Sequence, residues 1–362
     1  MILKFHPFCV GWPTDFLSQH VATWRNIPKQ ELFCRWSVSV LNDICTNSVR
    51  TGALIAEGRT VSFSAFYEHT LAAPAVFSGV GLHTGEQVRV TLRPAPARSG
   101  IVYVRTDITD RDNRIILSGR SVVQTQLGTV IANSAGVSVS TIEHLMAALC
   151  ALAIDNVVVE LNGPEIPIMD GSAEPFIQVL DRAGRRVLDA PRRFIEILAP
   201  IEVVQGDKRA SLTPADGFEL AFEIAFDSAV IGRQRVDFAM DETVFRRELA
   251  NCRTFGFLHE VEAMRRMGLA RGGSMENAIV IDNGRVLNPE GLRRRDEFVR
   301  HKALDAVGDL YVLGAPILGR FEGILAGHGI NNALVLALLD QPEAWRMATP
   351  ALEQPMALAR AG

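Results

Sequence analysis

An imidazole and a carboxylate stand four residues apart within residues 297–309, a stretch whose pattern predicts an α-helix. His301 and Asp305 therefore share one helix face, where their side chains can bind a single metal ion. Asp309, one turn further along, lies near the same face, whereas Lys302 reaches such a site only from its flank. The stretch can supply half of a metal site, and its partners must come from elsewhere in the chain.

Glu143 and His144 lie at the start of a second predicted helix, residues 140–150, which is apolar on most sides and therefore buried. Two interpretations of Glu143 stay open. Ser140 and Glu143 have the spacing of a capping box, in which the carboxylate binds a backbone N–H at the helix start. Alternatively, Glu143 is a functional carboxylate beside a histidine at the positive end of the helix. Considered alone, Glu143 fits the capping box better.

Two histidines compete for the third position of the predicted metal site. A catalytic zinc ion takes about three protein ligands and leaves one position for water. His301 and Asp305 provide two of them, and the third is either His144 or His328, which lies on a predicted tight loop between two glycines. The spacing along the chain leaves both histidines open.

The length of 362 residues exceeds what one hydrophobic core usually serves and predicts two domains, and 48% hydrophobic residues provide material for substantial cores. The formal net charge of -4 argues against a general nucleic-acid surface. The five cysteines include no C-x-x-C pair, so neither a disulfide framework nor a thiolate zinc site is indicated. The cysteines are therefore expected to be reduced thiols, as in the cytosol. The sequence shows no secretory signal and no apolar run of about 18 residues. We therefore expect a cytoplasmic protein without stable membrane insertion.

The sequence pattern divides the chain into four parts. Residues 1–67 have no sustained periodicity and form an N-terminal extension of unknown role, for which disorder is one alternative. Residues 68–190 form a first α+β domain, and a polar, proline-containing stretch leads into a second α+β domain at residues 193–340. Residues 341–362 contain three prolines and are expected to form a mobile tail.

Two local patterns in the second half predict β-structure. Residues 218–226 alternate between apolar and polar side chains, which is typical of a strand with one buried face. Asn283-Gly284 suits a type I′ turn, and the apolar residues on either side of it predict a β-hairpin.

Six blocks of the sequence carry a resemblance to a known family. They are residues 141–145, 155–156, 164–172, 253–257 and 297–309, and residues 327–328 with 331–332. In this order, spread over residues 70–340, they resemble the bacterial UDP-3-O-acyl-N-acetylglucosamine deacetylases of lipid A biosynthesis. The resemblance does not extend to residues 1–67 or to the tail.

The resemblance implies an α+β fold of two domains, each a sheet packed on helices in β-α-α-β order. The active site would lie between the domains. The family also carries a βαβ insert that forms an apolar passage for an acyl chain, and in this chain the insert would fall near residues 257–292.

The activity implied by the resemblance is that of a zinc-dependent amidohydrolase. Such an enzyme removes the N-acetyl group of UDP-3-O-(3-hydroxyacyl)-N-acetylglucosamine and releases acetate. Zn²⁺ is the expected cofactor, and Fe²⁺ is the alternative because two imidazoles and a carboxylate also suit ferrous iron. The expected partner is a small-molecule UDP-sugar carrying an acyl chain, without a nucleic-acid partner, and the protein is expected to be a monomer.

The family's central residues map onto positions already considered. Its metal ligands fall on His144, His301 and Asp305, its general base on Glu143 and its catalytic histidine acid on His328. Zinc lowers the pKa of a bound water to about 7. Glu143 is turned about 100° from His144 on a helix, so it could take a proton from that water without binding the metal.

Further residues receive supporting roles from the resemblance. Thr254 and Lys302 would stabilise the oxyanion, and the negative charge of Asp309 would keep His328 protonated. The expected substrate-lining residues are His83, Phe255, Phe257, Val261, Met264 and Met275.

Two other classes of function are disfavoured by the motifs. A zinc peptidase of the H-E-x-x-H type is one, because the chain has Glu-His followed much later by His-x-x-x-Asp. A non-catalytic binder of nucleotide sugars or acyl chains is the other, because such a protein would be expected to have lost at least one of the five central residues.

Overall fold

The computed structural model describes residues 53–56, 59–62 and 66–349, which belong to two compact units divided after Phe63. In the first unit, β1 (Ala53–Ala56) and β2 (Arg59–Ser62) form an antiparallel hairpin. The predicted extension, residues 1–67, therefore contains a hairpin, and its last residue begins β3 (Tyr67–Leu71) of the second unit. The other residues of that extension lie outside the described ranges.

A five-stranded sheet in the first half of the second unit has the order β4-β5-β11-β6-β7. The central strand, β11, runs antiparallel to β5 and parallel to β6. Val88, Val90 and Leu92 alternate with more exposed residues along β5, so one face of the sheet is buried in the core. The strands are β4 (Ala75–Val80), β5 (Gln87–Pro94), β6 (Ile101–Arg105), β7 (Arg114–Ile116) and β11 (Val157–Leu161).

Smaller elements complete the first half. Strands β8 (Val122–Gln124), β9 (Val130–Ala132) and β10 (Ser138–Val139) form a three-stranded sheet that follows the short 3₁₀ helix η3 (Gly119–Ser121). Strand β12 (Arg185–Pro191) pairs with β3. The next strand begins at Phe194, and a domain boundary at residues 190–193 stays a prediction.

The second sheet is organised around β21 (Ile317–Ile324). One edge of β21 pairs antiparallel with β15, and the other pairs in parallel with β13 at its start and with β16 further along. The strand predicted from the alternation of residues 218–226 is β16, which also pairs with β17. The other strands are β13 (Phe194–Ile197), β14 (Ile201–Gln205), β15 (Lys208–Thr213), β16 (Phe218–Ala225), β17 (Arg233–Ala239) and β22 (Trp345–Ala348).

The prediction of a mobile tail from residue 341 is wrong for its first part. Pro342–Ala344 form a 3₁₀ helix, η5, and β22 pairs antiparallel with β13 at the edge of the second sheet. The free edge of β13 supplied the hydrogen-bonding partner, which composition alone does not reveal. Residues 350–362 lie outside the described part of the chain.

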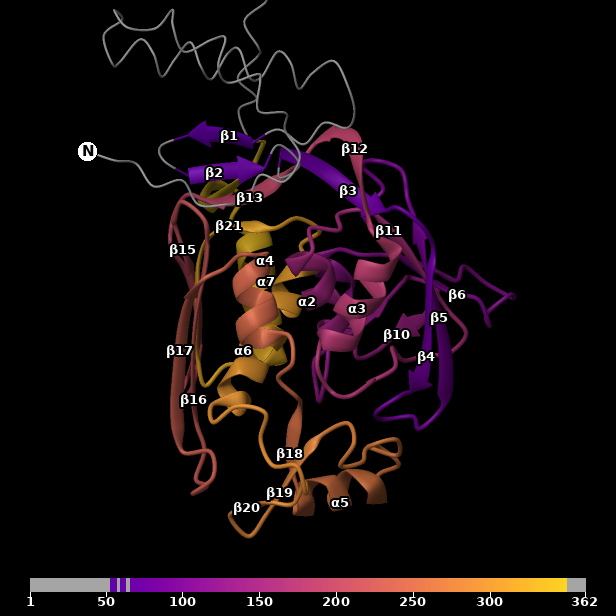
Figure 1. The fold of residues 1–362 in the computed structure, drawn as a ribbon, viewed down its shortest axis with the longest axis vertical. Helices are drawn as coiled ribbons and strands as arrows, with labels where there is room; N and C mark the ends of the chain where they lie inside the picture. The colour runs from indigo at the N-terminus through magenta and orange to yellow at the C-terminus, as the bar shows by residue number, and fades with distance from the viewer. Residues whose placement is uncertain (1–52, 57–58, 63–65, 350–362) are drawn as a thin grey trace, which may run out of the picture. The chain divides into compact units, whose positions relative to one another are not determined.

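Helices α2, α3, α6 and α7 lie between the two sheets (Figure 1), and the fold is α+β with helices packed on each sheet, as expected. Helix α3 contacts β4 of the first sheet, α7 contacts β14 and β15 of the second, and α2 contacts α6 between them. Along the chain, β11 lies between α2 and α3, and β21 lies between α6 and α7. The helices are α2 (Glu143–Ala151), α3 (Glu174–Ala183), α6 (Glu297–Tyr311) and α7 (His328–Leu339).

A βαβ unit connects the second sheet to α6, preceded by the helical turns α4 (Glu242–Val244) and η4 (Phe245–Leu249). It consists of β18 (Phe255–Phe257), α5 (Leu258–Arg266) and β19 (Ile279–Asp282), and β18 and β19 are parallel. The predicted hairpin is confirmed, because β20 (Arg285–Val286) pairs with β19 and both Asn283 and Gly284 have positive φ. A role of this unit as an acyl passage stays a prediction.

None of the helices within the described residues is both long enough and apolar enough to cross a membrane.

Gly308 allows α2 and α6 to pack closely where the candidate ligands lie. A Cβ atom added to Gly308 would stand 2.0 Å from the carbonyl oxygen of Glu143, the first residue of α2. A backbone atom at that distance cannot move aside as a flexible side chain would. The missing side chain therefore brings the start of α2 beside His301 and Asp305.

We expect Gly308→Ala to lower the free energy of unfolding. Alanine improves helix propensity by about 1 kcal/mol, but the backbone overlap forces α2 and α6 apart, and overpacking costs about 1–3 kcal/mol or more. Urea midpoints measure the difference. Gly217→Ala is the matched control, because nothing lies within 4 Å of a Cβ at that position. Equal midpoints for both variants would contradict the importance of this contact.

Candidate active site

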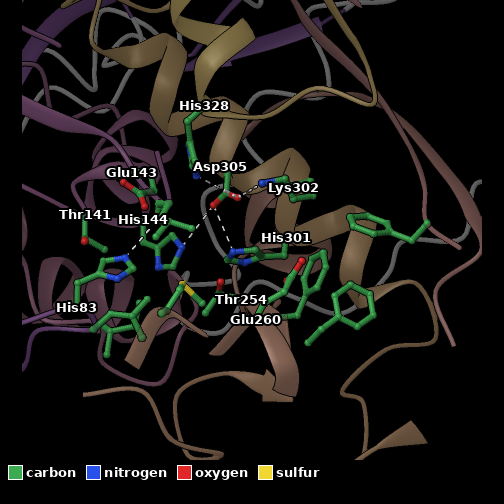
Figure 2. A pocket seen from close by; sticks show the side chains of 18 residues that line it. His83, Thr141, Glu143, His144, Thr254, Glu260, His301, Lys302, Asp305 and His328 are labelled. Carbon is green, nitrogen blue, oxygen red and sulfur yellow. Dashed lines mark hydrogen bonds and ion pairs between the residues drawn. The ribbon is translucent and has the colours of Figure 1, made fainter. Parts of the chain in front are cut away.

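Three buried side chains, His144, His301 and Asp305, place one possible ligand atom each within 4.8 Å of one another. The Nε2 atoms of His144 and His301 lie 3.4 Å and 3.3 Å from Asp305 Oδ1. Figure 2 shows both rings directed at this carboxylate. Of the two histidines left open by the spacing, His144 is in the group, whereas His328 binds Asp309 through Nδ1.

The protonation of His301 makes this group suited to a cation. Its Nδ1 lies 3.0 Å from the carbonyl oxygen of Cys252, which can only accept, so Nδ1 carries the proton. Burial lowers the pKa of His301 to about 3, although Asp305 acts in the opposite direction. The neutral ring then presents an Nε2 lone pair to Asp305 Oδ1, a buried atom without a hydrogen-bond partner in the described structure. The lone pairs of His301 Nε2 and Asp305 Oδ1 thus point at each other with no proton between them, an arrangement that suits binding of a divalent metal ion.

Lys302 contributes a positive charge at the flank of the group. Its Nζ lies 3.0 Å from the second oxygen of Asp305. Burial acts to lower the pKa of Lys302, but Asp305 outweighs it and raises that pKa. Burial likewise opposes ionisation of Asp305, yet its surroundings, which include the Lys302 cation, bring its pKa well below the usual value. Asp305 is therefore an anion at neutral pH, as a metal ligand must be.

Glu143 lies next to the group but outside it. Its carboxylate is 4% exposed and accepts a hydrogen bond of 2.9 Å from the backbone N–H of Thr129. Helix α2 begins at Glu143 without a side-chain cap, and Ser140 donates to the carbonyl of Pro164, so the capping-box interpretation is wrong. Burial raises the pKa of Glu143, which makes its carboxylate a stronger base than an exposed one.

His328 is the first residue of α7 and is paired with a buried carboxylate. Its Nδ1 lies 2.9 Å from Asp309 Oδ2, and its Nε2 lies 4.0 Å from Asp305. Burial acts to lower the pKa of His328, but the charge and hydrogen bond of Asp309 outweigh it and raise that pKa to about 9. Asp309 is itself held by Thr129 Oγ1 at 2.6 Å and by Asn331 Nδ2 at 2.9 Å.

Comparison with known proteins gives the family of the chain. The family model for LpxC, UDP-3-O-acyl N-acetylglycosamine deacetylase, matches residues 68–340. The chain belongs to this family. Its members are metal-dependent deacetylases, so the chain is an enzyme of the hydrolase class.

Three relatives illustrate the similarity, and each is named UDP-3-O-acyl-N-acetylglucosamine deacetylase. The protein of Phenylobacterium zucineum (strain HLK1) is 69% identical over 283 residues, which cover 78% of this chain and 97% of the relative. The Myxococcus xanthus (strain DK1622) protein is 48% identical, with coverages of 78% and 90%. A Neisseria meningitidis serogroup A protein is 50% identical, with coverages of 77% and 92%.

A cavity of about 280 Å³ opens beside the His-His-Asp group (Figure 2). Glu143, Thr254, Lys302 and His328 line it together with the His-His-Asp group, whereas Asp309 lies behind His328. The structure thus places the predicted metal ligands, base, acid and oxyanion residues around one space. Their catalytic roles in the family reaction stay predictions.

Four of the six expected substrate-lining residues border this cavity: His83, Phe255, Phe257 and Met264. Val261 and Met275 do not. Val261 lies on α5 behind Gly256, and the side chain of Met275 is 46% exposed in the loop between α5 and β19. Sequence position within the insert did not reveal which side chains face inward.

His83 reaches the cavity because a buried carboxylate orders its loop. Glu165 accepts hydrogen bonds from the backbone N–H groups of His83 and Thr84, each at 2.9 Å, and from the hydroxyl of Thr141 at 2.9 Å. The His83 Nε2 lies 3.2 Å from the carbonyl oxygen of Leu127. Glu165 thereby ties the glycine-rich turn to the segment that leads into α2.

Sequence reasoning missed several residues of the site. Thr129 was not expected there, although its backbone and hydroxyl hold Glu143 and Asp309, and its place between β8 and β9 gave no local signal. The carbonyl of Cys252 was also missed, because a backbone group has no residue signature. The unexpected cavity-lining residues are Leu82, Leu127, Thr141, Ile168, Phe226, Gly256 and Glu260.

We expect Asp305→Ala to bind divalent metal far more weakly than the parent protein, because one of three convergent ligands is removed. The loss should exceed the roughly 10- to 100-fold typical of residues that only support a ligand. Titration of Zn²⁺ and Fe²⁺ against a competing chelator measures it, and circular dichroism checks the fold. Asp340→Ala is the control, because Asp340 forms an exposed ion pair with Arg120. Parent-like affinity in Asp305→Ala would exclude this group as the metal site.

Proposed function

We propose that the chain hydrolyses the N-acetyl group of UDP-3-O-(3-hydroxyacyl)-N-acetylglucosamine and releases acetate, in lipid A biosynthesis. Membership of the deacetylase family supports the substrate. The observation that supports the chemistry is the arrangement of a raised-pKa carboxylate and a raised-pKa histidine beside three convergent ligand atoms. We propose Zn²⁺ as the metal, with Fe²⁺ as the alternative, bound by His144, His301 and Asp305.

The proposed mechanism assigns each proton to a named residue. When bound, the metal would lower the pKa of a coordinated water to about 7 and polarise the amide carbonyl. Glu143 takes a proton from the attacking water while the oxygen of that water forms a bond to the carbonyl carbon. His328 gives its Nε2 proton to the amide nitrogen as the carbon–nitrogen bond breaks, which leaves acetate and a free amine. Asp309 holds the Nδ1 side of the same ring.

Thr254 and Lys302 are proposed to stabilise the negative charge that develops on the carbonyl oxygen. Both border the cavity, and Lys302 is a cation with a raised pKa beside Asp305. A hydroxyl and an ammonium group held in a site of low polarity stabilise an oxyanion more strongly than water does, because they need no reorientation during the reaction.

The acyl chain of the substrate is proposed to lie along an aromatic group formed by Phe226 and the two phenylalanines of β18 in the βαβ unit. Phe226 contacts Phe255 and Phe257 with ring centroids 5.7 Å and 6.1 Å apart, and all three border the cavity. Phe226 is 36% exposed, so an acyl chain placed there would remove apolar surface from water.

We further propose a cytoplasmic monomer that acts on a small-molecule nucleotide sugar. The five cysteines without a C-x-x-C pair are typical of a reducing compartment, and the net charge of -4 does not favour nucleic acid as a partner.

The decisive experiment measures acetate release from the UDP-3-O-acyl-N-acetylglucosamine substrate by metal-free protein and after addition of Zn²⁺ or Fe²⁺. We expect activity with at least one metal. Glu143→Gln should retain the metal and lose about 100- to 10,000-fold in kcat, the usual contribution of a general base. Its amide keeps the size of the carboxylate but takes no proton.

Two results would overturn the proposed function. One is parent protein that binds metal and yet releases no acetate with either ion. The other is near-full activity in Glu143→Gln, which would mean that another group activates the water.

We expect Asp309→Asn to move the alkaline limb of the pH–rate profile to lower pH. The rate falls as His328 loses its proton, and the negative charge of Asp309 contributes to raising the pKa of His328 to about 9. Removing that charge lowers the pKa, so the proton is lost earlier as the pH rises. A bound cation near Asp305 acts in the same direction in parent and variant. Profiles of kcat/KM measure the shift.

Asp340→Asn provides the control for that profile, because it removes an exposed carboxylate that pairs with Arg120. It should leave the alkaline limb in place. An unmoved limb in Asp309→Asn would show that His328 is not the group whose proton limits the rate.

A further inference from the structure

Arg253 and Glu297 form an ion pair that is almost completely withdrawn from water. The two residues are 1% and 0% exposed. The Nε of Arg253 donates to Glu297 Oε1 at 3.0 Å, and its Nη2 donates to the carbonyl of Gly291 at 2.8 Å. Neither side chain borders the catalytic cavity. The pair therefore has no direct access to a substrate in that space.

Such a pair is not explained by stability alone. Taking two charges out of water costs about as much as their attraction returns, and apolar residues of similar size often serve equally well. What the pair provides is a fixed geometry. The carboxylate of Glu297 also accepts from the backbone N–H of Arg253 at 3.0 Å and of Arg293 at 2.6 Å. One carboxylate at the start of α6 thus holds two separate backbone segments.

The segment held by Glu297 continues directly into the site on both sides of Arg253. The carbonyl of Cys252 accepts the Nδ1 proton of His301, which lies one turn after Glu297 on α6. Thr254 borders the cavity, and its N–H donates to the carbonyl of Gly171 at 2.8 Å. A shift of this segment would move a ligand's hydrogen-bond partner and a cavity hydroxyl together.

We propose that Arg253 and Glu297 are positioning residues, which hold the Cys252 carbonyl against His301 and the Thr254 hydroxyl in the cavity. The segment is fixed to α6 at two successive turns, by the ion pair at Glu297 and by the carbonyl at His301. In this proposal, metal affinity depends on the contact between the Cys252 carbonyl and His301. The rate of hydrolysis depends on the position of the Thr254 hydroxyl. This inference rests on the proposed metal-dependent function.

Glu297→Gln tests the pair with little change in volume. We expect the affinity for Zn²⁺, measured against a chelator, to fall about 10- to 100-fold, the usual effect of losing a residue that supports a ligand. The kcat should fall while KM changes less, because Thr254 acts on the reacting carbonyl. In metal-free protein with ¹⁵N-labelled histidine, the Nδ1 proton of His301 should exchange faster with water than in the parent.

A double variant, Arg253→Met with Glu297→Met, separates positioning from folding. Both charges are removed, so no unpaired charge is buried. The N–H groups of Arg253 and Arg293 lose their acceptor, so circular dichroism and urea midpoints check the fold. The expected result is again weaker metal binding and a lower kcat. If Glu297→Gln does not fold, the double variant decides by the same two measurements. A folded double variant with the affinity and kcat of the parent would overturn the proposal.

Arg192→Lys is the matched control, because Arg192 forms another buried ion pair, with Asp155 at 2.8 Å, that does not contact the ligand residues. It should bind metal as the parent does, and an equal loss in this variant would also overturn the proposal. A parent protein that binds metal but releases no acetate would instead contradict the proposed function, whatever the variants do.

Discussion

The close contact between α2 and α6 is the constraint on which the candidate site depends. Each helix carries only part of the group, and a side chain at Gly308 would stand against the backbone of Glu143. Because the contact is made by backbone, it leaves little freedom to adjust. The distance between the helices therefore fixes how far His144 lies from His301 and Asp305. Helix α6 packs on β16 and β17 of the second sheet, and α2 packs on α3, which contacts β4 of the first.

Burial gives the site its chemistry because it acts with opposite sign on neighbouring groups. It raises the pKa of Glu143 and lowers that of His301, so the carboxylate is a stronger base than an exposed one and the imidazole stays neutral. His328 is the exception, since Asp309 outweighs burial and favours its charged form. Around one cavity, Glu143 is thus a strengthened base, His301 is neutral and His328 favours its protonated form. The arrangement requires that water be largely excluded from all of them.

Predictions based on local pattern agreed with the structure where local geometry decides it. Asn283-Gly284 forms the expected turn because its positive φ values suit these two residue types. The predictions failed where a distant segment supplied the partner. The capping box was wrong because the N–H of Thr129 binds the Glu143 carboxylate instead. The predicted mobile tail was wrong for β22, which uses the edge of β13.

The sequence by itself determined that His301 and Asp305 share a helix face, because a spacing of four residues means nearly one turn in any α-helix. It also determined the family, through motifs spread over most of the chain. Spacing left both His144 and His328 open, and the resemblance pointed to His144. The tertiary structure places His144, rather than His328, in the group beside that face. The physical reason is that ligand geometry needs a distance between helices, and such a distance arises from packing, which no spacing along the chain contains.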